Sequence, residues 1–361
     1  MRRIYRDYIL NKILKADVRW FFKLSLRYLL VQASFRIRRA LCGPILCHFF
    51  VTYQCNYRCK MCDLPSRDKK IGMQGLKHLS TPCMKKLIKD CADLGVIGMS
   101  FTGGEPLMRE DIFNLLSYAK ELGIITHLNT NGFFINEEVA ERLISIKVDS
   151  VSISLDGSRE VTHDTIRGAQ GSFKMALEAV EKINHARNLL KAPIRLKVSS
   201  VVNNSNVDEL PDMLKLFNDL DADSIEFIPE QPFFEGYKDN RFDASFFNKL
   251  DKSINYIIKA KRSGARVENS FRHLRLFEKS FKAERSPITC FAGYHSFGLD
   301  CFGNIFNCAS HVNMGKAVGN IKDTALKEFW YSSHYNALRN NIRRCGGCYL
   351  NCQAELDFLF S

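Results

Sequence analysis

The strongest constraint on the fold is an alternation of strand-like and helix-like segments between residue 45 and about residue 230. Six apolar runs with strand character lie near residues 45–53, 96–101, 124–128, 149–154, 193–202 and 223–228. Helical stretches separate them, among them Met84–Leu94, Glu110–Leu122, Glu137–Ile146, Phe173–Leu189 and Val207–Leu220. Because a helical crossover returns the chain to a parallel neighbouring strand, six repeats predict a parallel α/β sheet, either a barrel or a partial barrel.

Composition sets the number of folded units. The chain has 361 residues, 46% of them hydrophobic and 25% charged, which is enough for one large core and a smaller module. We expect four regions, namely a basic helical arm over 1–44, the α/β core over 45–235, a helical connector over 236–285 and a cysteine-rich module over 286–361.

Three cysteines follow the first strand-like run, in the segment Cys55-Asn-Tyr-Arg-Cys59-Lys-Met-Cys62. Their spacing lets all three sulfurs converge on one small object. A closed structural metal site uses four protein ligands, so three thiols indicate a cluster or metal with one open position. Disulfides are disfavoured, because one thiol is left over and no secretory signal is visible. A zinc site with a distant fourth ligand remains an alternative at this point.

The next three strand-like runs also end in polar, glycine-containing segments. These are Thr102-Gly103-Gly104-Glu105-Pro106, Asn129-Thr-Asn131-Gly132 and Ser154-Leu-Asp156-Gly157. Each segment alone would be an ordinary turn. Because the carboxyl ends of parallel strands meet on one rim, where barrel enzymes place their reacting groups, the four strand ends together predict a pocket for a polar ligand.

The cysteine spacing and the Gly-Gly-Glu-Pro segment together resemble the radical S-adenosylmethionine (SAM) superfamily over residues 45–230. The resemblance implies a partial (β/α)6 TIM-like barrel, with Cys55, Cys59 and Cys62 holding a [4Fe–4S] cluster whose open iron binds SAM. It further implies SAM contacts from Met61, Gly103, Gly104, Glu105, Pro106, Asn131, Ser154 and Arg167. The glycine-rich motif of the fifth strand is not recognisable in residues 196–203.

The resemblance also implies an activity. Such enzymes cleave SAM reductively, with an electron from a flavodoxin- or ferredoxin-type donor, and use the 5′-deoxyadenosyl radical to attack an unactivated C–H bond. The chemistry requires a strongly reducing cluster and exclusion of water, which thiolate ligands and a barrel interior can provide.

Six of the thirteen cysteines lie between residues 290 and 352. Cys290, Gly303-x4-Cys308 and Cys345-x2-Cys348 resemble the SPASM/twitch module, which binds auxiliary clusters. The resemblance implies one auxiliary [4Fe–4S] cluster held by Cys290, Cys308, Cys345 and Cys348. Cys352 could replace one of these ligands, and Cys301 is a spare. A zinc knuckle is the alternative.

Residues 1–40 contain eleven Lys and Arg against two Asp, a net charge of +9 out of +13 for the chain. Residues 8–31 predict an amphipathic helix whose basic stripe comprises Lys12, Lys15, Arg19, Lys23 and Arg27, opposite Leu10, Leu14, Val18, Phe21 and Tyr28, with Trp20 at the margin. This pattern favours a cytoplasmic protein peripherally bound to the inner face of an anionic membrane. A helix packed on the domain is the alternative, and no nucleic-acid partner is expected.

Three functions follow from these observations. The first is a radical SAM enzyme that modifies a membrane-associated substrate, as the basic helix suggests. The second is a SPASM-type maturase of a ribosomally made peptide, and the third is a non-catalytic iron–sulfur or zinc protein.

Overall fold

A computed structural model describes the chain except residues 1–17, 232–241, 343–344 and 346–347. Its centre is one nine-stranded sheet in the order β6-β5-β4-β3-β2-β1-β7-β8-β9. The strands are β1 (Leu46–Thr52), β2 (Gly98–Gly103), β3 (Ile125–Thr130), β4 (Ser150–Ser154), β5 (Arg195–Val202), β6 (Ser224–Pro229), β7 (Ser296–Asp300), β8 (Asn304–Phe306) and β9 (Gly319–Asn320). Strands β1 to β6 are parallel, and each predicted strand is present with ends within two residues of those observed.

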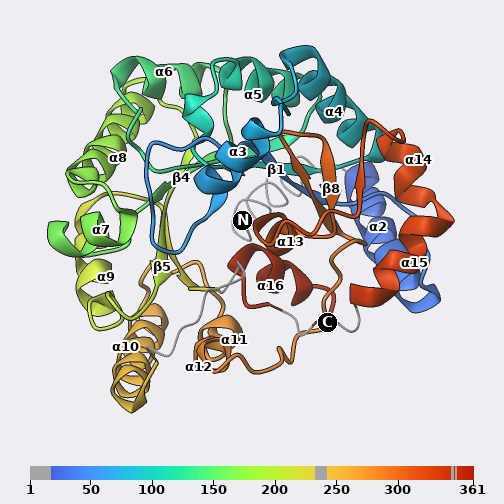
Figure 1. Cartoon of the computed structure of the whole chain (residues 1–361). Coiled ribbons are helices and arrows are strands. Elements are labelled where there is room, and N and C mark those ends of the chain that lie inside the picture. Colours follow the sequence, from blue (N-terminus) through green and yellow to red (C-terminus); the bar gives the residue numbers. More distant parts are fainter. Residues whose placement is uncertain (1–17, 232–241, 343–344, 346–347) are drawn as a thin grey trace.

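Helices cover the sheet on both sides (Figure 1). The helices of the first half are α2 (Val18–Ile37), α3 (Leu64–Met73), α4 (Thr81–Leu94), the 3-10 helix η1 (Pro106–Met108), α5 (Ile112–Glu121), α6 (Glu137–Ser145), α7 (Glu160–Arg167), α8 (Ser172–Leu189) and α9 (Leu210–Asp219). Those of the second half are α10 (Ala244–Arg262), α11 (Phe271–Leu274), α12 (Phe277–Phe281), α13 (Ala309–Asn313), α14 (Leu326–Tyr331), α15 (Ser333–Ile342) and α16 (Asn351–Asp357).

The sheet curves into the predicted partial barrel. Helices α4, α5, α6, α8 and α9 follow its outer side, whereas α13 and α16 lie on its inner side (Figure 1). All seven residues of β1 are buried, as expected for a strand of a parallel sheet that is covered on both faces. The core therefore occupies the layer between the sheet and the outer helices, and the inner side remains for the site.

The C-terminal module extends the barrel sheet. Strand β7 pairs in parallel with β1 over five residues, from Leu46 with Ser296 to Phe50 with Asp300. Strands β8 and β9 then continue the sheet antiparallel. The module is thus joined to the first strand by backbone hydrogen bonds as well as by side-chain packing.

Helix α2 covers the second part of the predicted helix and continues past its predicted end to Ile37. Residues 8–17 of that prediction lie outside the described residues. Arg27, expected in a solvated basic stripe, instead donates to the backbone oxygens of Leu94 (2.9 Å) and Pro44 (3.3 Å). This face of α2 packs on the domain, because Val31 belongs to an apolar cluster with Ile45, Leu46, Phe291, Tyr294, Leu356 and Phe360. In the part of the chain that the structure describes, no helix is long and apolar enough to span a membrane.

Candidate active site

The three-cysteine loop follows directly after β1 at the carboxyl rim of the barrel. The amide of Tyr57 donates to the Cys55 sulfur over 3.4 Å, and the amide of Cys62 donates to the Cys59 carbonyl over 3.1 Å. Burial raises the pKa of the Cys55 thiol to about 11, so an uncoordinated Cys55 is protonated at neutral pH. A metal centre binds the thiolate form, which its own positive charge stabilises.

The Gly-Gly-Glu-Pro segment packs against this loop. A Cβ atom on Gly103 would lie 2.1 Å from the Thr52 carbonyl oxygen, and one on Gly104 would lie 2.1 Å from the Gln54 oxygen. Gly103 also has a φ of +136°, which side-chain-bearing residues rarely adopt. Glycine is therefore required at both positions because they pack against the backbone of Thr52 and Gln54, just before Cys55. The sequence alone did not reveal this reason.

Glu105 is buried and points toward the end of β3. Its carboxylate accepts hydrogen bonds from the amides of Leu107 (3.0 Å) and Asn131 (2.8 Å) and from the Thr130 hydroxyl (2.8 Å). Burial nevertheless raises the pKa of Glu105 to about 7. By this geometry Glu105 holds Asn131 in place. Its contact with SAM stays a prediction.

Asn131, just after β3, and Arg167, at the end of α7, both reach the cysteine loop. The Asn131 amide nitrogen donates to the Asn56 side chain over 2.8 Å and lies 4.0 Å from the Cys55 sulfur. Arg167, the last residue of α7, lies with Nη1 3.9 Å from the Cys59 sulfur. Its Nε is 2.7 Å from an Asp156 carboxylate oxygen, and the guanidinium is almost completely covered.

The structure thus gathers most of the predicted SAM site around the cysteine loop. Pro106 begins η1, and Met61 faces the cavity described below. Ser154 lies half-buried at the end of β4, and no contact of its hydroxyl joins it to this group among the described residues. These roles toward SAM remain predictions.

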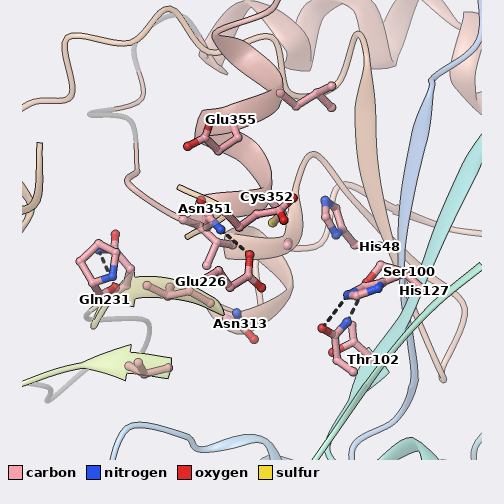
Figure 2. Close-up of a pocket in the computed structure, with 18 of the residues that line it drawn as sticks. His48, Ser100, Thr102, His127, Glu226, Gln231, Asn313, Asn351, Cys352 and Glu355 are labelled. Atoms are coloured by element: carbon pink, nitrogen blue, oxygen red, sulfur yellow. Dashed lines mark hydrogen bonds between the residues drawn. The ribbon is translucent and has the colours of Figure 1, made fainter. Parts of the chain in front are cut away.

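A cavity of about 900 Å³ runs through the barrel interior (Figure 2). Met61, Cys62 and Gly103 line it near the cysteine loop, and Asn351 and Cys352 line it from α16. Polar side chains project into it from otherwise apolar strands, namely His48 of β1, Ser100 of β2, His127 and Asn129 of β3, Lys197 of β5 and Glu226 of β6. Of these residues, sequence reasoning pointed only to Asn129, at a polar strand end, and missed the others. The available signal for His48, His127, Lys197 and Glu226 was a charged or imidazole side chain inside an apolar strand.

An ion pair fixes one side of the cavity. Lys197 Nζ lies 3.2 Å from the Glu226 carboxylate, which also accepts from the Ser199 hydroxyl (2.6 Å) and from the Asn351 amide. Burial opposes ionisation of Glu226, but Lys197 lowers the pKa of that carboxyl to about 2. Glu226 is therefore a charged anchor for the first turn of α16.

The two histidines of the cavity are neutral. Burial, with a smaller contribution from His295, lowers the pKa of His48 to about 4. Burial, with Lys197 nearby, lowers the pKa of His127 to about 3. His127 bonds to Ser150 (2.5 Å) and Asn129 (3.1 Å), so both of its ring nitrogens have partners.

The C-terminal cysteines form a second group beside α13, α15 and α16. Cys290 and Cys308 pack in one small cluster with Ala292 and Ile342. The Ser310 hydroxyl donates to the Cys348 sulfur over 3.4 Å, and the amide of Cys345 donates to the Ile342 carbonyl over 3.0 Å. Burial raises the pKa of the Cys290 thiol, and Asp357, Cys348 and Cys308 add to that rise, so these three thiols lie near one another.

Two further cysteines of this region differ in position. Burial raises the pKa of the Cys352 thiol, and the nearby Cys348 and Glu226 add to that rise. Cys352 also lines the barrel cavity. Cys301 is buried after β7 beside Asp300, and its carbonyl accepts from the Leu79 amide over 2.7 Å. Among the described residues, no group of three His, Cys, Asp or Glu side chains is arranged for a single metal ion.

Comparison with known proteins agrees with this geometry. Residues 49–217 match the radical SAM superfamily, and residues 290–353 match the SPASM iron–sulfur cluster-binding domain. An AdoMet-dependent heme synthase of Methanosarcina barkeri is 24% identical over 85% of this chain and 88% of its own length. A PqqA peptide cyclase of Gluconobacter oxydans is 25% identical over 84% of each chain.

Solved structures share the fold. Streptococcus suis SuiB bound to the precursor peptide SuiA gives a TM-score of 0.66 at 18% identity, covering 85% of this chain and 69% of SuiB. Native anSMEcpe with bound AdoMet gives a TM-score of 0.62 at 18% identity, covering 87% of this chain and 95% of that one. The predicted partial barrel and cysteine-rich module are confirmed.

Proposed function

The chain belongs to the radical SAM superfamily and carries a SPASM domain, and from this premise we propose that it modifies an unactivated C–H bond of a membrane-associated substrate. It is an enzyme rather than a non-catalytic cluster or zinc protein. Its cofactors are a [4Fe–4S] cluster that binds SAM and auxiliary iron–sulfur binding in the SPASM domain. When bound, cluster and SAM supply a 5′-deoxyadenosyl radical that removes the substrate hydrogen atom.

The residues of the rim suit these cofactors. We assign the SAM-binding cluster to Cys55, Cys59 and Cys62, where the Arg167 guanidinium offsets part of the thiolate charge. Asn131, held by Glu105, presents its amide next to Cys55. One auxiliary [4Fe–4S] cluster is assigned to Cys290, Cys308, Cys345 and Cys348. The electron comes from a low-potential donor of the flavodoxin or ferredoxin type.

The observation that carries the proposal is the course of the cavity. It extends from Met61 and Cys62 of the cysteine loop to Asn351 and Cys352 of α16, so that a substrate inside it lies between the two cysteine groups. Enclosure by the barrel keeps water from a reactive radical and holds the substrate carbon in position. Leu356 and Leu359 form part of the wall that α16 and its C-terminal extension contribute.

The exposed face of α2 supports a membrane-associated substrate. Phe22, Leu26 and Leu29 are 70%, 44% and 62% exposed and lie four and three residues apart, on one face of the helix. Arg36 and Arg38, exposed near the end of α2, add the positive charge that anionic lipid headgroups attract. An apolar face flanked by basic residues is the pattern of a helix lying in a membrane surface, here the inner face of the cytoplasmic membrane.

Helix α2 also lies next to the cavity wall. Tyr28 stacks on Phe360 with ring centroids 5.0 Å apart, and Gln32 donates to the Phe360 carbonyl. Phe360 directly follows Leu359, which lines the cavity. A membrane-bound α2 would therefore bring the apolar wall of the cavity close to the lipid.

The test is binding of the anaerobically reconstituted enzyme to sedimented liposomes with and without anionic lipid, together with SAM cleavage on a total lipid extract. We expect a Phe22→Ser, Leu26→Ser, Leu29→Ser variant to bind anionic liposomes at least ~10-fold more weakly. The matched control is Leu189→Ser with Leu190→Ser, two similarly exposed leucines at the end of α8. Equal binding of both variants and the parent would refute the membrane contact.

A peptide substrate is the second candidate. It is favoured by the PqqA peptide cyclase relatives and by the likeness of the fold to SuiB bound to its precursor peptide. The assay separates the two candidates if cell extract is divided into a lipid and a peptide fraction before incubation. Substrate-dependent 5′-deoxyadenosine formed only with the peptide fraction would replace the lipid proposal with the peptide one.

A further inference from the structure

Cys352 differs from the other C-terminal cysteines because it faces the barrel interior. Cys290, Cys308, Cys345 and Cys348 already supply four thiols, which is the number that one [4Fe–4S] cluster uses. Cys352 follows Asn351, whose amide is bound to Glu226, and both residues line the cavity (Figure 2). The Glu226–Asn351 bond thus fixes the first turn of α16 with the Cys352 thiol toward the cavity.

A second observation in the same cavity points to a ligand. His48 is only 3% exposed, and its Nε2 atom is buried without a hydrogen-bond partner among the described residues. A buried polar atom without a partner is unfavourable, and a hydrogen-bonding group of a bound molecule would remove that cost. Figure 2 shows His48 projecting into the cavity that Cys352 also lines.

We propose that Cys352 is not an auxiliary-cluster ligand but the hydrogen-atom donor to the substrate radical, and that His48 Nε2 binds a hydrogen-bonding group of that substrate. The inference rests on the proposed function, in which the substrate occupies this cavity. An S–H bond is weaker than an aliphatic C–H bond, so the transfer from sulfur to a carbon radical is downhill.

The substrate carbon, having lost one hydrogen atom to 5′-deoxyadenosine, forms a new C–H bond as the Cys352 S–H bond breaks. The sulfur is left as a thiyl radical. One electron from the low-potential donor and one proton from water then restore the thiol. The thiol approaches from α16, across the cavity from the cysteine loop on whose side the hydrogen was removed. The carbon therefore regains hydrogen on the opposite face, and the net change is an inversion at that carbon.

The first experiment asks whether Cys352 is a ligand. Iron and sulfide are measured in reconstituted Cys352→Ala and Cys352→Ser proteins, with Cys348→Ser as the ligand variant and Cys301→Ser as a buried control. We expect the Cys352 variants to keep the iron content of the parent and Cys348→Ser to lose about one cluster's worth, four irons. Loss of the same iron from both Cys352 variants would overturn the proposal.

Alkylation of the intact holoenzyme provides an independent measurement. Iodoacetamide followed by peptide mass mapping should modify Cys352 through the cavity, whereas the four ligand cysteines are protected. Exposed Cys83 serves as the positive control. Because burial raises the pKa of the Cys352 thiol, its alkylation is compared before and after iron is removed. Protection that is lost only on iron removal, as for Cys348, would identify Cys352 as a ligand and overturn the proposal. Neither of these two readouts depends on knowing the substrate.

The second experiment tests hydrogen transfer. The holoenzyme is incubated in D₂O with SAM, dithionite and the lipid extract, and separately with the peptide fraction. Because thiol hydrogens exchange with solvent, the parent should place one non-exchangeable deuterium on the product carbon, and Cys352→Ala at least tenfold less. Equal deuterium in the products of the parent and of Cys352→Ala would refute the donor role. If neither fraction yields a modified species, the proposed function is refuted. The iron and alkylation results then decide whether Cys352 is a ligand.

His48 is tested by the same reaction. His48→Phe fills similar space without a hydrogen-bonding nitrogen, and we expect it to raise KM at least tenfold while deuterium still enters each product molecule. His48→Gln, which keeps a hydrogen-bonding tip, should recover most of the KM. An unchanged KM in His48→Phe would remove His48 from the proposal.

Discussion

The Arg167 guanidinium lies 3.9 Å from the Cys59 sulfur and is the only charged side chain shown bonded to a rim cysteine in the described part of the chain. Asp156, 2.7 Å from Nε, fixes its orientation. Gly168, in the left-handed region at φ +60°, lets the end of α7 approach the Arg58 carbonyl, where a Cβ would be 2.3 Å away. Close backbone packing at Gly168 and the charge of Arg167 therefore both hold the end of α7 against the cysteine loop.

Replacing Arg167 with methionine should lower the reduction potential of the cluster at Cys55, Cys59 and Cys62. A positive charge near the thiolates favours the reduced, more negative cluster. We expect a shift of roughly 60 mV, equivalent to ~1.4 kcal/mol for one electron. The measurement is a potentiometric titration followed by EPR. Lys174→Met, at an exposed site on α8, is the control and should leave the potential unchanged.

Gly104→Ala should prevent assembly of the same cluster. The added Cβ would lie 2.1 Å from the Gln54 oxygen, one residue before Cys55, so the loop must shift. We expect at least tenfold less SAM cleavage and loss of about one cluster's iron after reconstitution. Gly72→Ala is the matched control, because a Cβ there meets no atom within 4 Å. Full iron content in Gly104→Ala would contradict the packing argument.

Glu105 should give stability a distinctive pH dependence. Burial raises the pKa of its carboxyl from 4.5 to about 7, so the folded state binds more protons than the unfolded state in that interval. Its contribution to the free energy of unfolding therefore falls as pH rises from about 4.5 to about 7, by up to ~3 kcal/mol. Urea denaturation at several pH values should show this slope in the parent and not in Glu105→Gln. Parallel pH profiles for both proteins would contradict the assignment.

The Lys197–Glu226 pair should be sensitive to removal of one partner. Lys197→Met leaves a buried carboxylate without its cation and should lower the free energy of unfolding by about 3–5 kcal/mol. The double variant Lys197→Met with Glu226→Gln should be less destabilised than the single one, as a double-mutant cycle by urea denaturation would show. The control is Lys215→Met, whose ion pair with Asp212 is solvent-exposed and should contribute less than ~1 kcal/mol. A cycle with no coupling energy would contradict the ion pair.

The lowered pKa of Glu226 also predicts the pH at which the Lys197–Glu226 pair stops stabilising the fold. The pair stabilises the fold above the unfolded pKa of 4.5, and that stabilisation is lost as pH falls toward about 2. In Lys197→Met the loss should begin at higher pH, because the carboxyl is no longer held ionised by the ammonium. Acid unfolding followed by circular dichroism measures the difference.

Sequence patterns predicted the barrel well because each strand is an apolar run bounded by turn residues. The run that became β1 shows this, since its burial on both faces leaves no alternation to misread. Topology predicted the rim, because Cys55 and Asn131 follow strands, Gly103 ends β2 and Arg167 ends the helix α7. Spacing alone could place these residues on one rim. It could not show that Gly103 and Gly104 pack against the backbone of Thr52 and Gln54.

Tertiary contacts decided the rest. His48 and Lys197 occupy strand positions whose facing direction depends on the curvature of the sheet, which no local pattern specifies. Periodicity placed Arg27 in a basic stripe, yet it donates to backbone carbonyls of two other segments, at Pro44 and Leu94. Cys352 lay within the spacing of a ligand, and only the bond between Asn351 and Glu226 indicates why its helix begins at the cavity.

The parallel pairing of β7 with β1 has a consequence for engineering. The strand that bears the cysteine loop shares its edge with the first strand of the C-terminal module over five residues. A chain truncated before residue 286 would leave that buried, apolar edge of β1 open to pairing with other molecules. Exchange of cluster modules between relatives therefore needs the crossover placed outside this strand pair, with the register of Leu46 against Ser296 kept intact.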